Sequence, residues 1–169
     1  MGFKEKVLMR KKIIIAFSFI FIALLAVLGY GITNRAFSTE DMLPSEYKIG
    51  IPYSKALQSD KPAIVLFYTD WCGYCKRFMP KFKIINKLYK DDYNFVMLNT
   101  EAQDNAIIVS DAAITGLPTL YIFDPKYENR VHLTNGIYMD LKKLRKELDR
   151  YLTIRKRLDF SENCVAKQF

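Results

Sequence analysis

The stretch Trp71-Cys72-Gly73-Tyr74-Cys75-Lys76 decides how this chain is interpreted. It follows closely on an apolar run, Ala63 to Tyr68, whose length and composition are typical of a strand buried on both faces. It opens a segment from Lys76 to Lys90 in which apolar residues recur every three or four positions, as in an amphipathic helix. A strand that leads into a helix through Cys-x-x-Cys is the layout of a dithiol redox site.

The pattern on either side of this stretch predicts an α/β fold. Strands and helices alternate at first and end with a hairpin, which indicates a central mixed sheet with helices on both faces. Pro80 lies inside the helix that follows the cysteines and is expected to kink it. Besides 63–68 and 76–90, we expect strands at 93–98, 119–123 and 130–134, the last at an edge, and helices at 53–59, 104–113 and 139–157.

Length and charge limit the alternatives. The chain has 169 residues and a net charge of +8, enough for one domain of about 100–150 residues with extensions. Basic residues gather in 1–12 and along 139–157, where acidic residues are interspersed. No nucleic-acid-binding motif accompanies them, so we interpret the two groups as a membrane-orienting segment and a solvated helix face, and expect no nucleic-acid partner.

Residues 13–32 form an apolar block of twenty residues. That length spans a bilayer core of about 30 Å as a helix. Basic residues precede the block and only Arg35 follows it closely, so the positive-inside rule leaves 1–12 in the cytoplasm and 33–169 outside. We expect an uncleaved signal-anchor. The alternative is secretion after cleavage near Ala36-Phe37-Ser38, which fits a signal-peptidase site loosely.

Several features coincide at spacings that resemble the thioredoxin superfamily, over about Tyr53 to Leu152. Pro80 stands five residues after Cys75, the segment Gly116-Leu117-Pro118-Thr119 follows some 40 residues later, and Gly136 precedes the final helix. The resemblance implies a thioredoxin fold, a redox-active Cys72–Cys75 pair and a cis-proline at Pro118 opposite the dithiol. The expected organisation is a basic segment 1–12, a transmembrane segment 13–32, a linker 33–52, a thioredoxin-like domain 53–157 and a loose tail 158–169.

The chain also departs from the family. A buried acid usually stands six residues before the first cysteine, with a lysine partner on the next strand; here these positions hold Leu66 and Met97. Because both charges are absent together, no buried charge is left unpaired, but the usual proton relay behind Cys75 is missing. The dipeptide Gly73-Tyr74 resembles that of some periplasmic disulfide isomerases, whereas Leu117 before the proline resembles thioredoxin.

The chemistry assigns expected roles to the two cysteines. The nucleophile of disulfide exchange is a thiolate, which a helix N-terminus favours. Cys72 would stand there as the nucleophile, and Lys76 would add positive charge. Cys75 lies one turn further on and would resolve the mixed disulfide.

The neighbours of the cysteines would bind the substrate. Gly73 permits a close approach of another chain, and Tyr74 replaces a rigid proline. Trp71 and Leu117 would form an apolar docking rim. Pro118 has no N–H to offer, so the backbone of Leu117 would pair with an extended substrate strand.

These residues also admit other interpretations. Zinc needs about four ligands, and only His132 and Cys164 remain besides the pair, at no recognised spacing. A static structural disulfide is the other alternative for the pair, and the position of the pair at a helix start favours a reactive dithiol over it. Pro118 could be an ordinary trans proline. Cys164 is interpreted as an incidental thiol, with pairing to another protein as the alternative.

Taken together, the sequence predicts a membrane-anchored thiol–disulfide oxidoreductase with its domain in the periplasm, anchored in a bacterial inner membrane. Cysteines of exported proteins would be its substrates, a membrane or periplasmic redox partner would recycle it, and no cofactor or metal is expected. The pattern Cys-Gly-x-Cys with Leu117 favours reduction, while oxidation and isomerisation stay open. The alternative class is a non-catalytic binding or assembly module of an envelope complex, which Leu66 supports and the retained Trp71 and Pro118 oppose.

Overall fold

The computed structural model of the chain describes residues 13–27 and 42–166, and it comprises two units, Met1–Asp41 and Met42–Phe169. In the first unit, 13–27 is helical, so the predicted span 13–32 is described only in part. The basic segment 1–12 and residues 33–41 of the predicted linker lie outside the described residues. Within the described ranges, no helix combines the length and the apolar character needed to cross a membrane, and a membrane-spanning helix is therefore not confirmed.

The second unit is built on a mixed four-stranded sheet, as predicted. The strands are β1 (Ala63–Tyr68), β2 (Asn94–Asn99), β3 (Thr119–Asp124) and β4 (Asn129–Leu133), in the order β2-β1-β3-β4. β1 pairs in parallel with β2 and antiparallel with β3, and β4 lies antiparallel to β3 at the edge. β1 is central and all six of its residues are buried, as its continuous apolar sequence requires.

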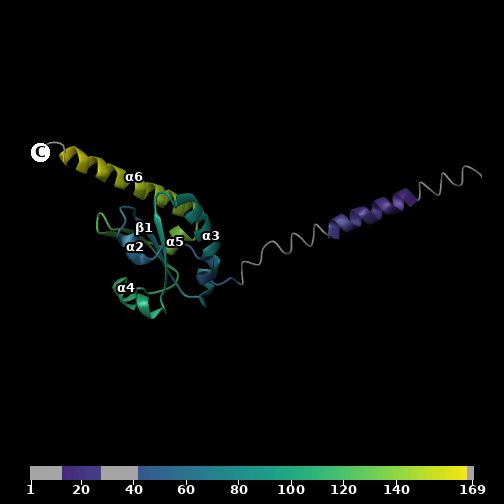
Figure 1. Ribbon diagram of the computed structural model, residues 1–169, viewed down its shortest axis with the longest axis horizontal. Helices are drawn as coiled ribbons and strands as arrows, with labels where there is room; N and C mark the ends of the chain where they lie inside the picture. Colours follow the sequence, from purple (N-terminus) through teal and green to yellow (C-terminus); the bar gives the residue numbers. More distant parts are fainter. Residues whose placement is uncertain (1–12, 28–41, 167–169) are drawn as a thin grey trace, which may run out of the picture. The chain divides into compact units, whose positions relative to one another are not determined.

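Helices cover both faces of this sheet (Figure 1). They are α2 (Tyr53–Leu57), α3 (Gly73–Tyr89), α4 (Ala106–Asp111), α5 (Asn135–Tyr138) and α6 (Leu141–Ala166), with 3-10 turns η1 (Pro44–Tyr47) and η2 (Gln103–Asn105). Side chains alternate along β1. Ile64, Leu66 and Tyr68 join the core under α3, α5 and α6, whereas Ala63, Val65 and Phe67 join the core under α2 and α4. The two-sided core holds the unit together and positions the start of α3.

The predicted linker 33–52 is wrong for its second half. Residues 42–52 belong to the folded unit, where Tyr47 and Ile49 pack against the core under α3. The N–H of Ile51 donates to the carbonyl of Phe95 at 2.8 Å. Gly50 makes this approach possible, because its φ is +93° and a Cβ there would lie 2.3 Å from the Phe95 oxygen.

The predicted loose tail is also wrong as far as Ala166, because α6 continues well past 157. Charged residues of this extension have partners on the turn after β3. Lys126 pairs with Asp159 and with Glu162, the latter at 2.9 Å, and the hydroxyl of Tyr127 donates to Asp159 at 2.8 Å. These contacts stabilise the extension, while 167–169 lie outside the described residues. The Asn135-Gly136 pair, a dipeptide typical of turns, lies in α5.

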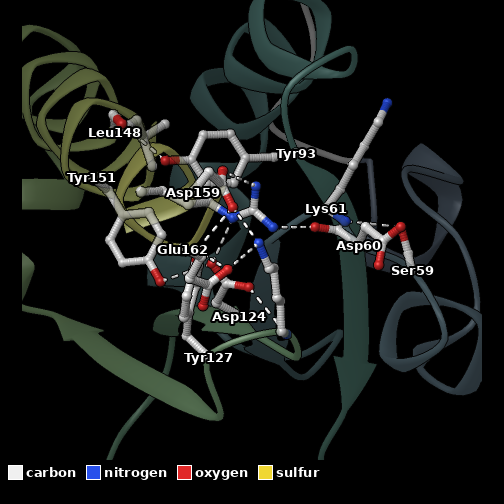
Figure 2. Close-up of polar contacts among 12 residues, drawn as sticks. Ser59, Asp60, Lys61, Tyr93, Asp124, Tyr127, Leu148, Tyr151, Asp159 and Glu162 are labelled. Carbon is white, nitrogen blue, oxygen red and sulfur yellow. Dashed lines mark hydrogen bonds and ion pairs between the residues drawn. The ribbon is translucent and has the colours of Figure 1, made fainter. Parts of the chain in front are cut away.

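A buried carboxylate connects α6 to the sheet. Asp124, the last residue of β3, is fully buried. Its Oδ2 accepts a hydrogen bond from Nε of Arg155 at 2.7 Å and one from the hydroxyl of Tyr151 at 3.3 Å. Figure 2 shows Asp124, Tyr151 and Asp159 gathered where α6 passes the end of the strand. Arg155 also donates to the backbone carbonyl of Asp60, so it connects three segments of the chain.

Replacing Arg155 is expected to destabilise the folded unit strongly. The variant Arg155→Ala leaves the carboxylate of Asp124 buried without its cation, which costs about 3 kcal/mol of unfolding free energy. Chemical denaturation followed by circular dichroism measures the change. The matched control is Arg150→Ala. Arg150 lies on the same helix, its side chain is 56% exposed, and its pair with Glu147 is expected to be worth about 1 kcal/mol or less. Equal losses in the two variants would contradict this account of Asp124.

Candidate dithiol active site

Cys72 stands at the N-terminus of α3, directly after the carboxyl end of β1. It is the residue before the first helical turn, and its Sγ accepts the backbone N–H of Cys75 at 3.2 Å. The N–H of Cys72 donates to the carbonyl of Thr69 at 3.4 Å, which turns the chain into the helix. Free N–H groups and the helix dipole favour an anion at this position. The sulfur of Cys72 therefore caps the N-terminus of α3.

Cys75 occupies a different environment one turn later. It is fully buried, in the same core cluster as Phe78 and Leu66. Burial, followed by the hydrogen bond with Cys72, raises the pKa of the Cys75 thiol to about 12. Cys75 therefore stays protonated at neutral pH. Both cysteines are free thiols in the structure.

The positions that hold a charged pair in the related family are apolar and adjacent here. Leu66 of β1 and Met97 of β2 are register partners across the parallel ladder. Leu66 is fully buried and Met97 packs against the same cluster as Cys75. Two apolar side chains therefore lie side by side at the two positions where the family's pattern would place an acid and a lysine.

The segment before β3 is held by hydrogen bonds of its own. The Leu117–Pro118 peptide bond is cis, as predicted. Thr119 donates its hydroxyl to the carbonyl of Gly116 at 2.6 Å, and the carbonyl of Pro118 accepts the hydroxyl of Tyr138 at 2.7 Å. Leu117 is half-buried and packs against both core clusters.

Tyr138 links this segment to the dithiol, and the sequence analysis missed it. Its side chain is buried, and burial raises its pKa, with further contributions from the charges of Cys75 and Cys72. It follows Asn135-Gly136, a dipeptide typical of turns. That signal hid the short helix α5 that carries the tyrosine into the core.

The rim around Cys72 is exposed and partly acidic. Trp71 is 70% exposed, and its indole Nε1 donates to Oε1 of Glu101 at 2.8 Å. Asp70 accepts the backbone N–H of Ser45 at 3.0 Å and the Ser45 hydroxyl at 2.9 Å. Glu101 was missed, although its position just beyond β2 gives a signal. Because β1 and β2 are parallel, the loops after both strands meet at one edge of the sheet.

The residues between and after the cysteines lie toward solvent. A Cβ on Gly73 would meet nothing within 4 Å, so the glycine leaves room for another chain. The exposed ring of Tyr74 lies 4.4 Å from the guanidinium carbon of Arg77. Lys76 is half-buried, and its N–H donates to the carbonyl of Cys72 at 3.0 Å.

His132 and Cys164 stand apart from the dithiol. His132 is exposed on the edge strand β4, and Cys164 is exposed near the end of α6. Among the residues that the structure describes, no group of three or more His, Cys, Asp or Glu side chains is arranged to hold a metal ion.

Comparison with known proteins agrees with this geometry. The thioredoxin family model matches residues 50–150. The thioredoxin-like protein HCF164 of the Arabidopsis thaliana chloroplast is 31% identical over 106 residues, 61% of this chain and 39% of that protein. Protein disulfide-isomerase 1 of Dictyostelium discoideum is 35% identical over 102 residues, 59% of this chain and 27% of that protein. This chain therefore matches well under half the length of these curated relatives.

A solved structure supports the fold. The J-Trx1 fragment of ERdj5 superposes with a TM-score of 0.52 at 17% identity, covering 61% of this chain and 49% of that chain. At this identity the likeness concerns the fold alone.

The two cysteines are expected to react at different rates with an alkylating reagent. Iodoacetamide should label Cys72 at least about tenfold faster than Cys75 between pH 6 and 9, because thiolate is the reactive form. The raised pKa of Cys75 keeps its thiol neutral throughout that range, so its labelling should accelerate only at strongly alkaline pH. Peptide mass spectrometry measures both rates, and the same protein in urea, where both thiols are exposed, is the control. Equal rates in the folded protein would contradict the assignment.

Proposed function

The chain belongs to the thioredoxin family, and from that premise we propose that it is a thiol–disulfide oxidoreductase that reduces disulfides of extracytoplasmic proteins. The observation that carries this proposal is the difference between the two thiols. Cys72 is 6% exposed and its Sγ accepts a helix N–H, whereas Cys75, one turn further on, is completely buried and burial raises its pKa. Two-step exchange requires a thiolate that attacks first and a second, neutral thiol that attacks only after the mixed disulfide has formed.

The proposed reaction moves two electrons from the domain to the substrate. The Cys72 thiolate attacks one sulfur of a substrate disulfide, forms a mixed disulfide and releases the other sulfur as a thiolate. Cys75 then loses its proton and attacks Sγ of Cys72, which releases the second substrate sulfur. The domain is left with a Cys72–Cys75 disulfide, and a dithiol redox partner must return two electrons before the next turnover.

Removal of the proton from the Cys75 thiol is the most difficult step in this mechanism. Its pKa is raised to about 12, and the carboxylate that the family usually supplies is replaced by Leu66. The substrate thiolate released in the first step is generated beside Cys72. With an ordinary thiol pKa of about 8.5 it is a weaker base than the Cys75 thiolate, so the proton transfer must occur together with the attack on Sγ of Cys72. In this proposal the departing thiolate takes the proton, which couples the second step to the first.

The substrate would dock across the exposed rim. Trp71 offers an apolar face whose orientation is set by Glu101. Tyr74 and Leu117 extend that face, and the backbone of Leu117 would pair with an extended stretch of the substrate. Lys76 would add positive charge near the nucleophile.

The location of the domain is part of the proposal. The apolar block 13–32 would anchor the chain in a bacterial inner membrane, with the basic residues of 1–12 in the cytoplasm and the dithiol on the periplasmic side. Helical structure over 13–27 is consistent with this. Secretion after cleavage of the same segment is the alternative.

A non-catalytic role in an assembly is the second candidate. The apolar pair of Leu66 and Met97 removes the usual aid to proton transfer, and this observation favours a domain that binds partners without turnover. The names of several relatives also include disulfide isomerases, so isomerisation is a third outcome for the assay below.

Insulin reduction tests the proposed activity. With dithiothreitol as the electron donor, the protein should accelerate precipitation of the insulin B chain well above the uncatalysed rate. Cys72→Ser should abolish the acceleration because it removes the nucleophile, whereas Cys164→Ser should leave it unchanged. Refolding of scrambled ribonuclease under the same conditions distinguishes isomerisation. Wild-type protein inactive in both assays would support the non-catalytic role.

Trapping of mixed disulfides tests the substrates and the location together. Cys75→Ala removes the resolving thiol, so clients should accumulate on Cys72 as covalent complexes that mass spectrometry identifies. We expect exported proteins with cysteines among them, and no complexes in Cys72→Ser/Cys75→Ala. Trapped proteins drawn only from the cytoplasm would overturn the proposed topology.

A further inference from the structure

Tyr138 contacts two parts of the site through one buried side chain. It is only 5% exposed, and its hydroxyl donates to the carbonyl of Pro118 at 2.7 Å. Its ring packs against Phe78 of α3, with ring centroids 5.1 Å apart and planes inclined at 63°. One rigid side chain therefore spans the distance between the helix that starts at the dithiol and the segment before β3.

The Tyr138 hydroxyl keeps the proton that it donates to the Pro118 carbonyl. Burial raises the pKa of Tyr138, and negative charge on Cys75 or Cys72 raises it further, so the hydroxyl keeps its proton even when the dithiol is ionised. The Pro118 carbonyl is buried beside it and needs a donor. The bond therefore persists through the changes of charge that disulfide exchange brings to the two sulfurs.

The backbone that carries Tyr138 is itself held against α3. Nζ of Lys81, one turn after Phe78, donates to the carbonyl of Met139 at 2.7 Å. The N–H groups of Tyr138 and Met139 donate within α5, to Thr134 and Asn135 at 3.1 Å each. The backbone of the tyrosine is thus held against α3, and its hydroxyl is held by Pro118. The length of the Tyr138 side chain therefore sets the distance between α3 and the Pro118 segment.

We propose that Tyr138 is a positioning residue for disulfide exchange. Its hydroxyl holds the segment Gly116–Pro118 in the position, relative to Cys72, that allows a substrate strand to pair with Leu117. The inference rests on the proposed function and adds a residue to its machinery. Tyr138 acts through Pro118 and does not touch the substrate. Its loss should therefore weaken substrate docking and leave the reactivity of the Cys72 thiol unchanged.

Tyr138→Phe in the full chain removes only the oxygen. For reduction of insulin we expect KM to rise about fivefold and kcat to stay within about twofold, the pattern of a lost docking contact. Alkylation of Cys72 by iodoacetamide, which needs no docking, should stay within about twofold of the wild-type rate. An unchanged KM, or a parallel fall in the alkylation rate, would overturn the proposal.

Tyr93→Phe is the matched control. Tyr93 is equally buried, and its hydroxyl donates to the backbone carbonyl of Leu148 at 2.8 Å. The two variants lose the same kind of hydrogen bond, and their melting temperatures should fall by similar amounts. Only Tyr138→Phe should change KM. If both variants raise KM equally, the effect is general destabilisation and the positioning role is wrong.

Hydrogen exchange separates this inference from the proposed function, because it needs no turnover. Amides of residues 115–119 should exchange about fivefold faster in Tyr138→Phe than in the wild type or in Tyr93→Phe. Unchanged exchange would overturn the positioning role even if the protein is an active reductase. Faster exchange in a protein that reduces no disulfide would support the role of Tyr138 in the structure and count against the proposed reaction alone.

Discussion

Burial of β1 on both faces is the constraint on which the rest of the structure depends. Each of its six residues is buried, so helices must cover both sides of the sheet. The strand can emerge from the core only at its ends, and at the carboxyl end Thr69 turns the chain into α3. The cysteines occupy that turn, and the alternation along the strand determines that α3 lies on the face formed by Ile64, Leu66 and Tyr68.

The same placement separates the properties of the two thiols. The sulfur of Cys72 accepts the N–H of Cys75 in the first helical turn, whereas the side chain of Cys75 is completely buried. Apolar surroundings, with Leu66 across from Met97, leave the buried thiol without a neighbouring carboxylate and raise its pKa. A site of this kind stores one reactive and one unreactive thiol in the reduced state. In the proposed reaction, the substrate thiolate released at Cys72 would act as the base that these apolar surroundings lack.

The sheet's other end is stabilised by charge. Asp124 would be costly to bury alone, and Arg155, 16% exposed, supplies the cation and further hydrogen bonds. Arg155 also donates to the backbone carbonyl of Asp60 in the loop before β1, so it connects α6 to the beginning of the central strand. α6 packs against the same core cluster as α3. The C-terminal extension of α6 is held by ion pairs with Lys126, in the turn after β3 (Figure 2).

Local patterns in the sequence determined most of the fold and the positions of Trp71, Cys72, Cys75 and Pro118. Continuous apolar runs, helical periodicity and motif spacing are short-range signals, and the mixed sheet with helices on both faces follows from them. Contacts between distant segments were decided only by the tertiary structure: Tyr138 on Pro118, Glu101 on Trp71, and Lys126 on the end of α6. The local sequence around Tyr138, or around the charged end of α6, does not identify the residue that it contacts. That residue comes within hydrogen-bonding distance only when the whole sheet has formed.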